Sequence, residues 1–350
     1  MYSSKLIIIG TGGTIAGQSA AAEDLTGYHA GELSVEALVS SVPGLGQYGP
    51  FESKQFCNID SSDMTVKRWQ GLAKLVQSYV DRPDVGGVVI THGTDTMEET
   101  AYFVHLTVNT NKPIVFTGSM RPASAISAEG PLNLLQAVQT ARSEESVGQG
   151  VLVVLNGAID CSRDVHKAHT TAVETFESPY FGHMGFVQEG VPRFYYKTLR
   201  KHTADSQFAT KASALRIFDE SQDLPLVIAL TLYADMPAAV LDGILALKPQ
   251  GLVLGGLGHG ILPEGIHQKV SQLGIPVVRA SRTGSGMVSS GTPLAAPFLV
   301  SDTLTPQKAR ILLMLGLCQT DSIKELQELF MPIKLLMNLI CQSFELVIDL

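Results

Sequence analysis

Four short runs of consecutive apolar residues recur in the first half of the chain, and each ends in a polar turn. They read KLIIIGTGG, VGGVVITHGTD, KPIVFTGSM and GVLVVLNGAID. Strands that are apolar along their whole length are typical of a parallel sheet covered on both faces. Helical patterns lie between or beside these runs, at Val66–Val80, Thr96–Thr107 and Gly130–Arg142. Alternation of this kind predicts right-handed crossovers between parallel strands.

A second and smaller unit of the same kind follows. Residues 196–223 are polar and irregular, and we expect them to form a linker. Beyond them, the runs LPLVIALTLYAD, GLVLGGLGHG and IPVVRASRTGSG alternate with helical patterns. The sequence therefore predicts an α/β protein with a larger N-terminal domain, 1–195, whose mostly parallel sheet is flanked by helices. A smaller C-terminal parallel-sheet domain, 224–333, and an extra tail of unassigned role, 334–350, complete the chain.

Composition and charge argue against several classes of binding partner and site. The formal net charge of −8 gives no basic footprint for a nucleic acid or an anionic membrane. No stretch is apolar enough over about 18 residues to span a bilayer. The four cysteines are far apart, without the paired spacing of a zinc site. No leader-like pattern of basic and then apolar residues follows Met1, so we expect a cytoplasmic protein.

The first turn, GTGGTIAG, fits neither common glycine-rich nucleotide motif. Gly10 and Gly12 are in register for a dinucleotide fingerprint, but Ile15 stands where its third glycine is needed. Gly17 has the spacing of a phosphate-binding loop, but Gln18 stands in place of the lysine that pairs with the phosphate. We therefore expect no nucleotide cofactor at this turn.

What the first turn offers instead is the hydroxyl of Thr14, after two glycines that let the backbone approach a ligand closely. The second turn carries Thr94, Asp95 and Thr96. A helix N-cap with Glu99 as its partner would use only one of them. Ligands of such sheets bind beyond the carboxyl ends of the strands. We expect four turns at that edge: Thr11–Thr14, Thr91–Thr96, Thr117–Met120 and Asn156–Asp160.

Lys167 adds a basic group after the fourth run. A lysine beside an aspartate and a threonine can act as a base. His166 and His169 flank it, but no carboxylate or cysteine accompanies them at ligand spacing, so no metal site is expected.

The segments GTGGTIAG, HGTDTMEETAYF, GSMRP and RDVHK, in this order, resemble the bacterial-type L-asparaginase (asparaginase/glutaminase) family from about Lys5 to Ile333. The resemblance implies hydrolysis of L-asparagine to L-aspartate and ammonia through a threonine acyl-enzyme, with minor L-glutaminase activity. It implies a catalytic set of Thr14, Tyr28, Thr94, Asp95 and Lys167. It also implies a substrate-binding set of Ser61, Ser62, Asp95 and Ser119, with no cofactor and no metal.

The resemblance also implies a role for each residue. Thr14 takes the position of the nucleophile, and Tyr28 that of the loop tyrosine paired with it. Ser61 would hold the substrate α-carboxylate, and Asp95 the α-ammonium. The backbone of Ser119 would lie beside the side-chain amide of the substrate.

The sequence departs from the family pattern at three places. Ser62 stands where exported members carry Gln or Glu, and His259 replaces an Asn. The loop RTGSGMVSSGTPLAAPF has no carboxylate, although the family takes a glutamate from a neighbouring subunit there. Substrate affinity is therefore expected to be lower or differently built.

The resemblance further implies a homotetramer, a dimer of dimers with shared active sites, and no nucleic-acid or membrane partner. One alternative is an amino-acid-binding or regulatory protein with a degraded site. Another is a subunit of a tRNA-dependent amidotransferase. Such subunits carry an extra N-terminal β domain, for which the stretch before Lys5 is too short.

Overall fold

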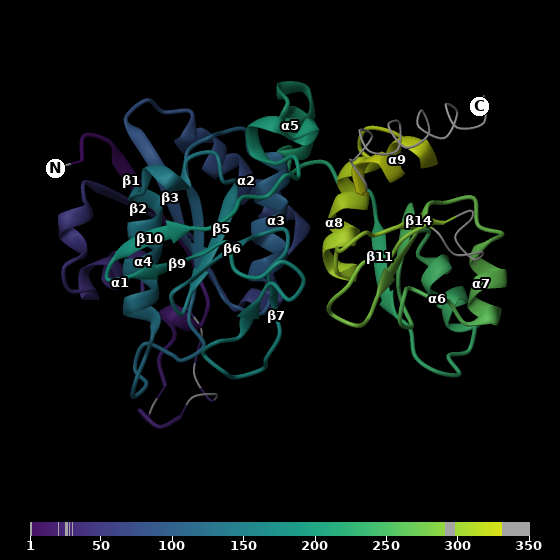
Figure 1. Ribbon diagram of the computed structural model, residues 1–350, viewed down its shortest axis with the longest axis horizontal. Coiled ribbons are helices and arrows are strands. Elements are labelled where there is room, and N and C mark those ends of the chain that lie inside the picture. Colours follow the sequence, from purple (N-terminus) through teal and green to yellow (C-terminus); the bar gives the residue numbers. More distant parts are fainter. Residues whose placement is uncertain are drawn as a thin grey trace, which may run out of the picture. The chain divides into compact units, whose positions relative to one another are not determined.

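A computed structural model describes residues 2–19, 21–24, 27, 29, 31–290 and 298–330. Contacts within the chain divide it into two compact units, residues 1–224 and 225–350, each with a sheet and helices of its own (Figure 1). The predicted class, two α/β units, is confirmed. The tail 334–350 lies outside the described residues.

The N-terminal unit is built on a mixed sheet. Its strands are β1 (Lys5–Gly12), β2 (Phe51–Ile59), β3 (Val85–Thr91), β4 (Ile114–Thr117), β5 (Val151–Leu155), β6 (Ala158–Cys161), β9 (Gly185–Gln188) and β10 (Val191–Phe194). Within the described residues their order is β10-β9-β6-β5-β4-β3-β1-β2. The pairs among β1 to β5 are parallel, as predicted. The pairs that add β6, β9 and β10 are antiparallel.

The change of direction occurs at Asn156 and Gly157. Their φ angles of 50° and 79° lie in the left-handed region, as a two-residue type I′ hairpin turn requires. The expectation for Asn156–Asp160 is therefore wrong in part, since Ala158–Asp160 leave the carboxyl edge within β6. A separate hairpin of β7 (His166–Lys167) and β8 (Phe176–Glu177) follows.

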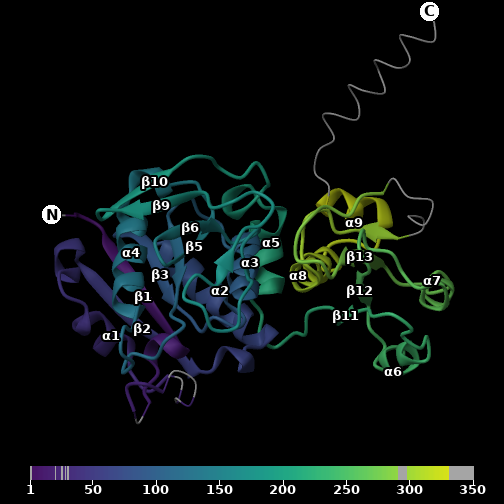
Figure 2. The same cartoon turned by 60° about the horizontal axis from the view of Figure 1, so that its bottom comes forward.

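Both faces of the parallel strands are covered, which explains their continuous apolar runs. The helices of this unit are α1 (Val35–Ser41), α2 (Val66–Val80), α3 (Met97–Thr107), α4 (Gly130–Arg142) and α5 (Lys211–Ile217). On β1, Leu6 and Ile8 belong to a core that includes side chains of α1 and α4. Ile7 and Ile9 are equally buried but point to the other face, because side chains alternate along a strand. Figure 2 shows α2 and α3 covering that face.

Single turns of 3₁₀ helix connect many of these elements. They are η1 (Thr14–Ala16), η2 (Leu45–Tyr48), η3 (Ser61–Asp63), η4 (Glu144–Ser146), η5 (Thr203–Asp205) and η6 (Gln207–Ala209). The stretch 196–223, expected as a linker, contains η5, η6 and α5 and falls within the first unit. Ser206 ties it to α3, because its hydroxyl donates to the carbonyl of Leu106 at 2.6 Å.

The C-terminal unit has a smaller, all-parallel sheet. Its strands are β11 (Val227–Thr231), β12 (Gly251–Gly256), β13 (Val277–Ser281) and β14 (Leu299–Val300), paired in that order. Its helices are α6 (Val240–Ala246), α7 (Glu264–Val270), α8 (Pro306–Gly316) and α9 (Ile323–Phe330). Leu241 of α6 and Ile266 of α7 pack on Leu252 and Leu254 of β12 in one core. The predicted parallel C-terminal sheet is confirmed.

None of the helices in the described part of the chain is sufficiently long and apolar to cross a membrane.

Candidate active site

The first and third strands of the chain end in turns whose backbones touch. β1 and β3 are neighbours in the sheet, so their carboxyl ends lie side by side. A Cβ added to Gly13 would lie 2.4 Å from the Cα of Gly93, a distance that real Cβ atoms do not reach. Thr14 and Thr94 directly follow these two glycines, and both are buried. The close approach of two glycines therefore places the predicted threonines in adjoining turns.

Gly13 has φ 77° and ψ −177°, a combination that only glycine adopts readily. We predict that Gly13→Ala lowers the free energy of unfolding by at least about 3 kcal/mol, because backbone strain and the clash with Gly93 add. Gly148→Ala is the matched control: its φ is 73°, but an added Cβ would meet nothing within 4 Å. We expect the control to lose about 1 kcal/mol in denaturant unfolding, from left-handed φ alone. Equal losses in the two variants would contradict the contact between the turns.

Lys167 connects the second turn to the β7–β8 hairpin. Its Nζ donates to Thr94 Oγ1 at 2.9 Å and lies 2.6 Å from Asp95 Oδ1. The lysine side chain is 17% exposed, and that of Asp95 is 58% exposed. The structure therefore brings Thr94, Asp95 and Lys167 into one cluster, with one face of the Asp95 carboxylate open to a ligand.

Ser61 lies on the other side of the second turn, at the start of η3. Its Oγ accepts the backbone N–H of Asp95 at 3.2 Å, and its carbonyl accepts the hydroxyl of Thr96 at 2.7 Å. Thr96 occupies the N-cap position of α3, but its side chain makes no capping bond. The Thr96 side chain therefore does not cap α3, because its hydroxyl binds Ser61 instead.

Ser62 and Ser119, also predicted to bind substrate, direct their hydroxyls to neighbouring protein atoms. Ser62 Oγ donates to Asp60 Oδ1 at 2.8 Å. Ser119 is buried, and its Oγ donates to the carbonyl of Arg121 at 2.7 Å. Tyr28 lies outside the described residues.

Two residues that sequence reasoning missed hold the turn that contains Ser119. The Glu129 carboxylate accepts the backbone N–H groups of Met120 and Arg121. Asn133 Nδ2 donates to the carbonyl of Gly118 at 3.0 Å. No local sequence pattern predicts either role, because both residues lie outside the turn. Asn133 is in α4, and Glu129 is the residue before α4.

His92 directly follows β3 and is fully buried, with its ring 6.0 Å from that of Phe116 in β4. Its Nδ1–H donates to the carbonyl of Gly93 at 2.7 Å, and none of the described residues offers a hydrogen-bond partner to its Nε2. Burial away from water lowers the pKa of His92 from 6.5 to about 4. The imidazole is therefore neutral at pH 7 and adds no charge next to Thr94.

The lowered pKa of His92 predicts acid sensitivity. Between pH 6.5 and pH 4 the unfolded chain binds a proton at this residue that the folded chain does not, so stability falls as the pH falls. The loss reaches roughly 3 kcal/mol below pH 4. His92→Asn keeps a donor to Gly93 at the same position and does not titrate. We expect the unfolding midpoint of this variant to change less than that of the wild type from pH 7 to pH 4. Equal changes in the two proteins would contradict the lowered pKa of His92.

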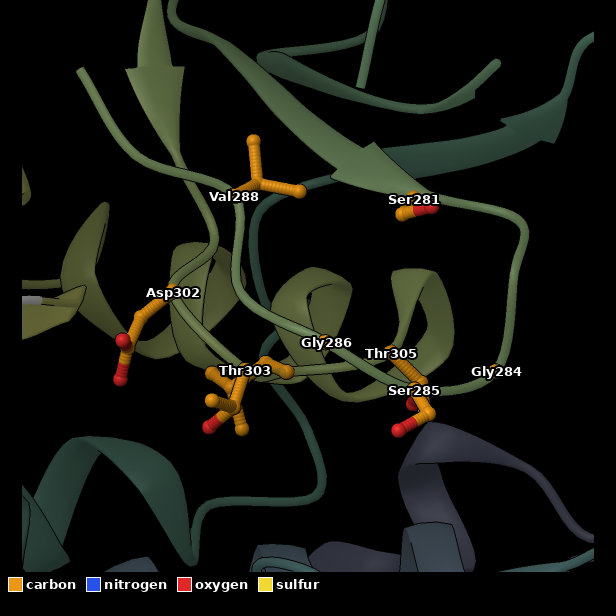
Figure 3. A pocket seen from close by; sticks show the side chains of 9 residues that line it. Ser281, Gly284, Ser285, Gly286, Val288, Asp302, Thr303 and Thr305 are labelled. Carbon is orange, nitrogen blue, oxygen red and sulfur yellow. The ribbon is translucent and has the colours of Figure 1, made fainter. Parts of the chain in front are cut away.

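Two hollows in the described residues lie away from this cluster. One, of about 250 Å³, is mainly apolar and is lined by Ile15 and by side chains of α1 and α4. The other, in the C-terminal unit, lies between the loop after β13 and the start of α8 and is rich in hydroxyls, among them Ser281, Ser285 and Thr305 (Figure 3). At about 20 Å³ it has room for about one water molecule. None of the candidate catalytic residues lines either hollow.

Over the described ranges, no three His, Cys, Asp or Glu side chains come close enough together to hold a metal ion. His169, considered above for that role, uses the lone pair of its Nδ1 to accept two backbone N–H groups.

Two touching turns at the carboxyl edge of a mixed α/β sheet thus carry hydroxyl groups, and a lysine binds a threonine and an aspartate there. This combination of groups is one that hydroxyl-based hydrolases use. The chain matches the asparaginase N-terminal model over residues 5–200 and the glutaminase/asparaginase C-terminal domain model over residues 226–330. It therefore belongs to the asparaginase/glutaminase family, as the motifs predicted.

Individual relatives cover nearly the whole chain. L-asparaginase 2 of Escherichia coli strain K12 is 39% identical, over 93% of this chain and 92% of the relative. Glutaminase-asparaginase of Acinetobacter glutaminasificans is 35% identical, over 93% and 99%. The crystal structure of a probable cytoplasmic L-asparaginase from Campylobacter jejuni superimposes with a TM-score of 0.86 and 38% identity, over 93% and 99%. The chain is an asparaginase-family amidohydrolase.

Proposed function

We propose that this enzyme is an L-asparaginase that converts L-asparagine to L-aspartate and ammonia through an acyl-enzyme at Thr14, with minor activity on L-glutamine. The observation that carries the proposal is the contact of Lys167 with both Thr94 and Asp95, beside the turn that holds Thr14. Membership of the family adds support, because its named members act on these two amides.

Thr14 is the better nucleophile of the two threonines. As an ammonium, Lys167 donates to Thr94 Oγ1 and draws electron density from that oxygen. Thr94 is then suited to stabilise charge and to relay a proton rather than to attack. Thr14 follows two glycines, in the turn that approaches Gly93.

In the first half-reaction, the Thr14 oxygen attacks the side-chain carbonyl and forms an ester bond. The C–N bond breaks, and the leaving amide nitrogen takes a proton and departs as ammonia. Tyr28 is proposed, on the family resemblance alone, to receive the hydroxyl proton of Thr14. Water then attacks the ester, releases L-aspartate and restores the hydroxyl. Backbone N–H groups near Thr94 are proposed to stabilise the oxyanion; each such donor contributes about 10²–10³ in rate.

Substrate orientation is proposed to depend on Ser61, Asp95 and the backbone of Ser119. The Asp95 carboxylate keeps one oxygen for the substrate ammonium while the other binds Lys167. The Ser61 hydroxyl, fixed by the Asp95 N–H, would donate to the α-carboxylate. Ser62 is proposed to contact substrate only weakly, since its hydroxyl binds Asp60.

Ammonia release from L-asparagine and L-glutamine tests the proposal. We predict that kcat/KM is higher for asparagine by about 10- to 100-fold, the discrimination that one methylene group allows. Equal values would make the protein a glutaminase-asparaginase. Release from neither amide would contradict the proposal and favour the amino-acid-binding alternative, which calorimetry with L-asparagine would detect as binding without turnover. Release only with an added tRNA-dependent partner would indicate the amidotransferase alternative.

We further propose a homotetramer with shared active sites and a cytoplasmic location. Both rest on the family resemblance, and likeness to a structure named as a probable cytoplasmic L-asparaginase supports the second. Light scattering of the purified protein measures the mass of the assembly; a monomer with full activity would contradict shared sites.

A further inference from the structure

Lys167 is carried by a small hairpin that is separate from the main sheet. Only two residue pairs join its strands, and one of them pairs Lys167 with Phe176. The next residue, Ala168, donates its N–H to the carbonyl of Thr175 at 2.7 Å and closes the ladder. Beyond that point the loop has no strand partner, so its order depends on its own contacts.

His169 supplies three of those contacts. The backbone N–H groups of Thr171 and Ala172 donate to its Nδ1 at 3.1 and 2.9 Å. Its carbonyl accepts the hydroxyl of Thr175, a buried residue directly before β8. The side chain thus closes the turn as an aspartate or asparagine does when it accepts N–H groups two and three residues later.

We propose that His169 is a positioning residue for the amide hydrolysis: by closing this turn, it holds the hairpin so that Lys167 Nζ stays within reach of Thr94 and Asp95. The inference rests on the function proposed above and extends it to a residue that need not touch substrate. His169 to Thr171 are exposed, and Ala172 and Val173 are only half-buried, so packing contributes little to the order of this part of the loop. The hydrogen bonds from the Thr171 and Ala172 N–H groups to His169 Nδ1 order the turn instead.

The effect should fall on kcat rather than on KM. Lys167 contacts Thr94, which lies beside the nucleophile, and a displacement of about 1 Å at such a group can lower the rate by up to about 10². The hairpin loop is a surface feature, so its loosening should leave the unfolding midpoint nearly unchanged.

Three substitutions of His169 test whether a hydrogen-bond acceptor at the δ position is the property of the side chain that matters. His169→Asn places Oδ1 where Nδ1 was and keeps the acceptor. His169→Ala removes it, and His169→Gln moves it one bond further out. We expect kcat for L-asparagine to fall about tenfold in the alanine and glutamine variants, with KM little changed, and to be close to wild type in His169→Asn. A low kcat in His169→Asn, or an unchanged one in both other variants, would overturn the inference.

Amide hydrogen exchange of a peptide that spans 168–175 tests the loop without reference to activity. We expect faster exchange in His169→Ala and His169→Gln but not in His169→Asn. Faster exchange with an unchanged kcat would show that the loop and Lys167 are independent, and the inference would fail while the proposed function stood. If the wild type released no ammonia from either amide, the proposed function would fail, and this role in catalysis with it, whatever the exchange pattern.

Discussion

Replacing Thr14 with alanine is expected to lower ammonia release from L-asparagine by about 10⁴-fold or more, because the only atom that forms the covalent bond is removed. The side chain is buried beside a turn fixed by two glycines, so deletion of its hydroxyl should leave the backbone in place. Initial rates with an ammonia-coupled assay, at saturating and at low asparagine, give kcat and KM separately.

Two controls accompany the Thr14→Ala variant. Thr14→Ser keeps a hydroxyl and should retain measurable turnover, with a lower kcat because the methyl group no longer restricts its rotamer. Thr107→Ala removes another buried hydroxyl, one that donates to the carbonyl of Phe103 within α3, and should leave kcat unchanged. Retention of more than about a hundredth of the wild-type rate in Thr14→Ala would contradict its role as nucleophile.

Lys167→Met is expected to have the second largest effect, a loss of about 10²–10³ in kcat. Methionine fills a similar volume but removes the charge that binds Thr94 at 2.9 Å and Asp95 at 2.6 Å. Both partners then lose their orientation, and Asp95 keeps an uncompensated charge in the site. Steady-state kinetics should show a smaller change in KM, because Asp95 keeps its charge for the substrate ammonium and Ser61 does not contact the lysine.

Lys269→Met is the matched control for that change. Lys269 Nζ lies 2.5 Å from Asp242 Oδ1 in the C-terminal unit, and its side chain is 28% exposed. The substitution therefore breaks an ion pair of similar length and should leave kcat as it is. An equal loss of activity in the two variants would mean that Lys167 acts through general stability rather than through Thr94.

The parallel part of the fold could be predicted because a single physical rule governs it. Strands buried on both faces are apolar throughout, and the helices between them show a 3.6-residue period. The helices predicted at Val66–Val80 and Gly130–Arg142 have those bounds in the structure. The hairpin at Asn156 and Gly157 is also predictable from the sequence, since this dipeptide is typical of type I′ turns. The short helices within 196–223 depend on tertiary contacts, such as Ser206 with α3, that no local pattern indicates.

The candidate site could be predicted only in part, for a related reason. Thr14 and Thr94 follow neighbouring parallel strands, so topology alone brings them to one edge. The contact of Lys167 with Thr94 joins residues 73 positions apart in the chain, and the family resemblance rather than spacing suggested it. Residues that support the turns, such as Glu129 and His169, are ordinary polar residues in the sequence. Their role is visible only from the N–H groups that they accept.

Acid quenching during turnover shows which threonine carries the acyl group, for which we propose Thr14. The enzyme is mixed with L-asparagine, quenched within milliseconds and digested, and the peptides are examined by mass spectrometry for an added aspartyl group. We predict the adduct on the peptide that contains Thr14, and none in the Thr14→Ala variant. An adduct on the peptide that contains Thr94, with the Thr14 peptide unmodified, would contradict the account and reverse the roles of the two threonines.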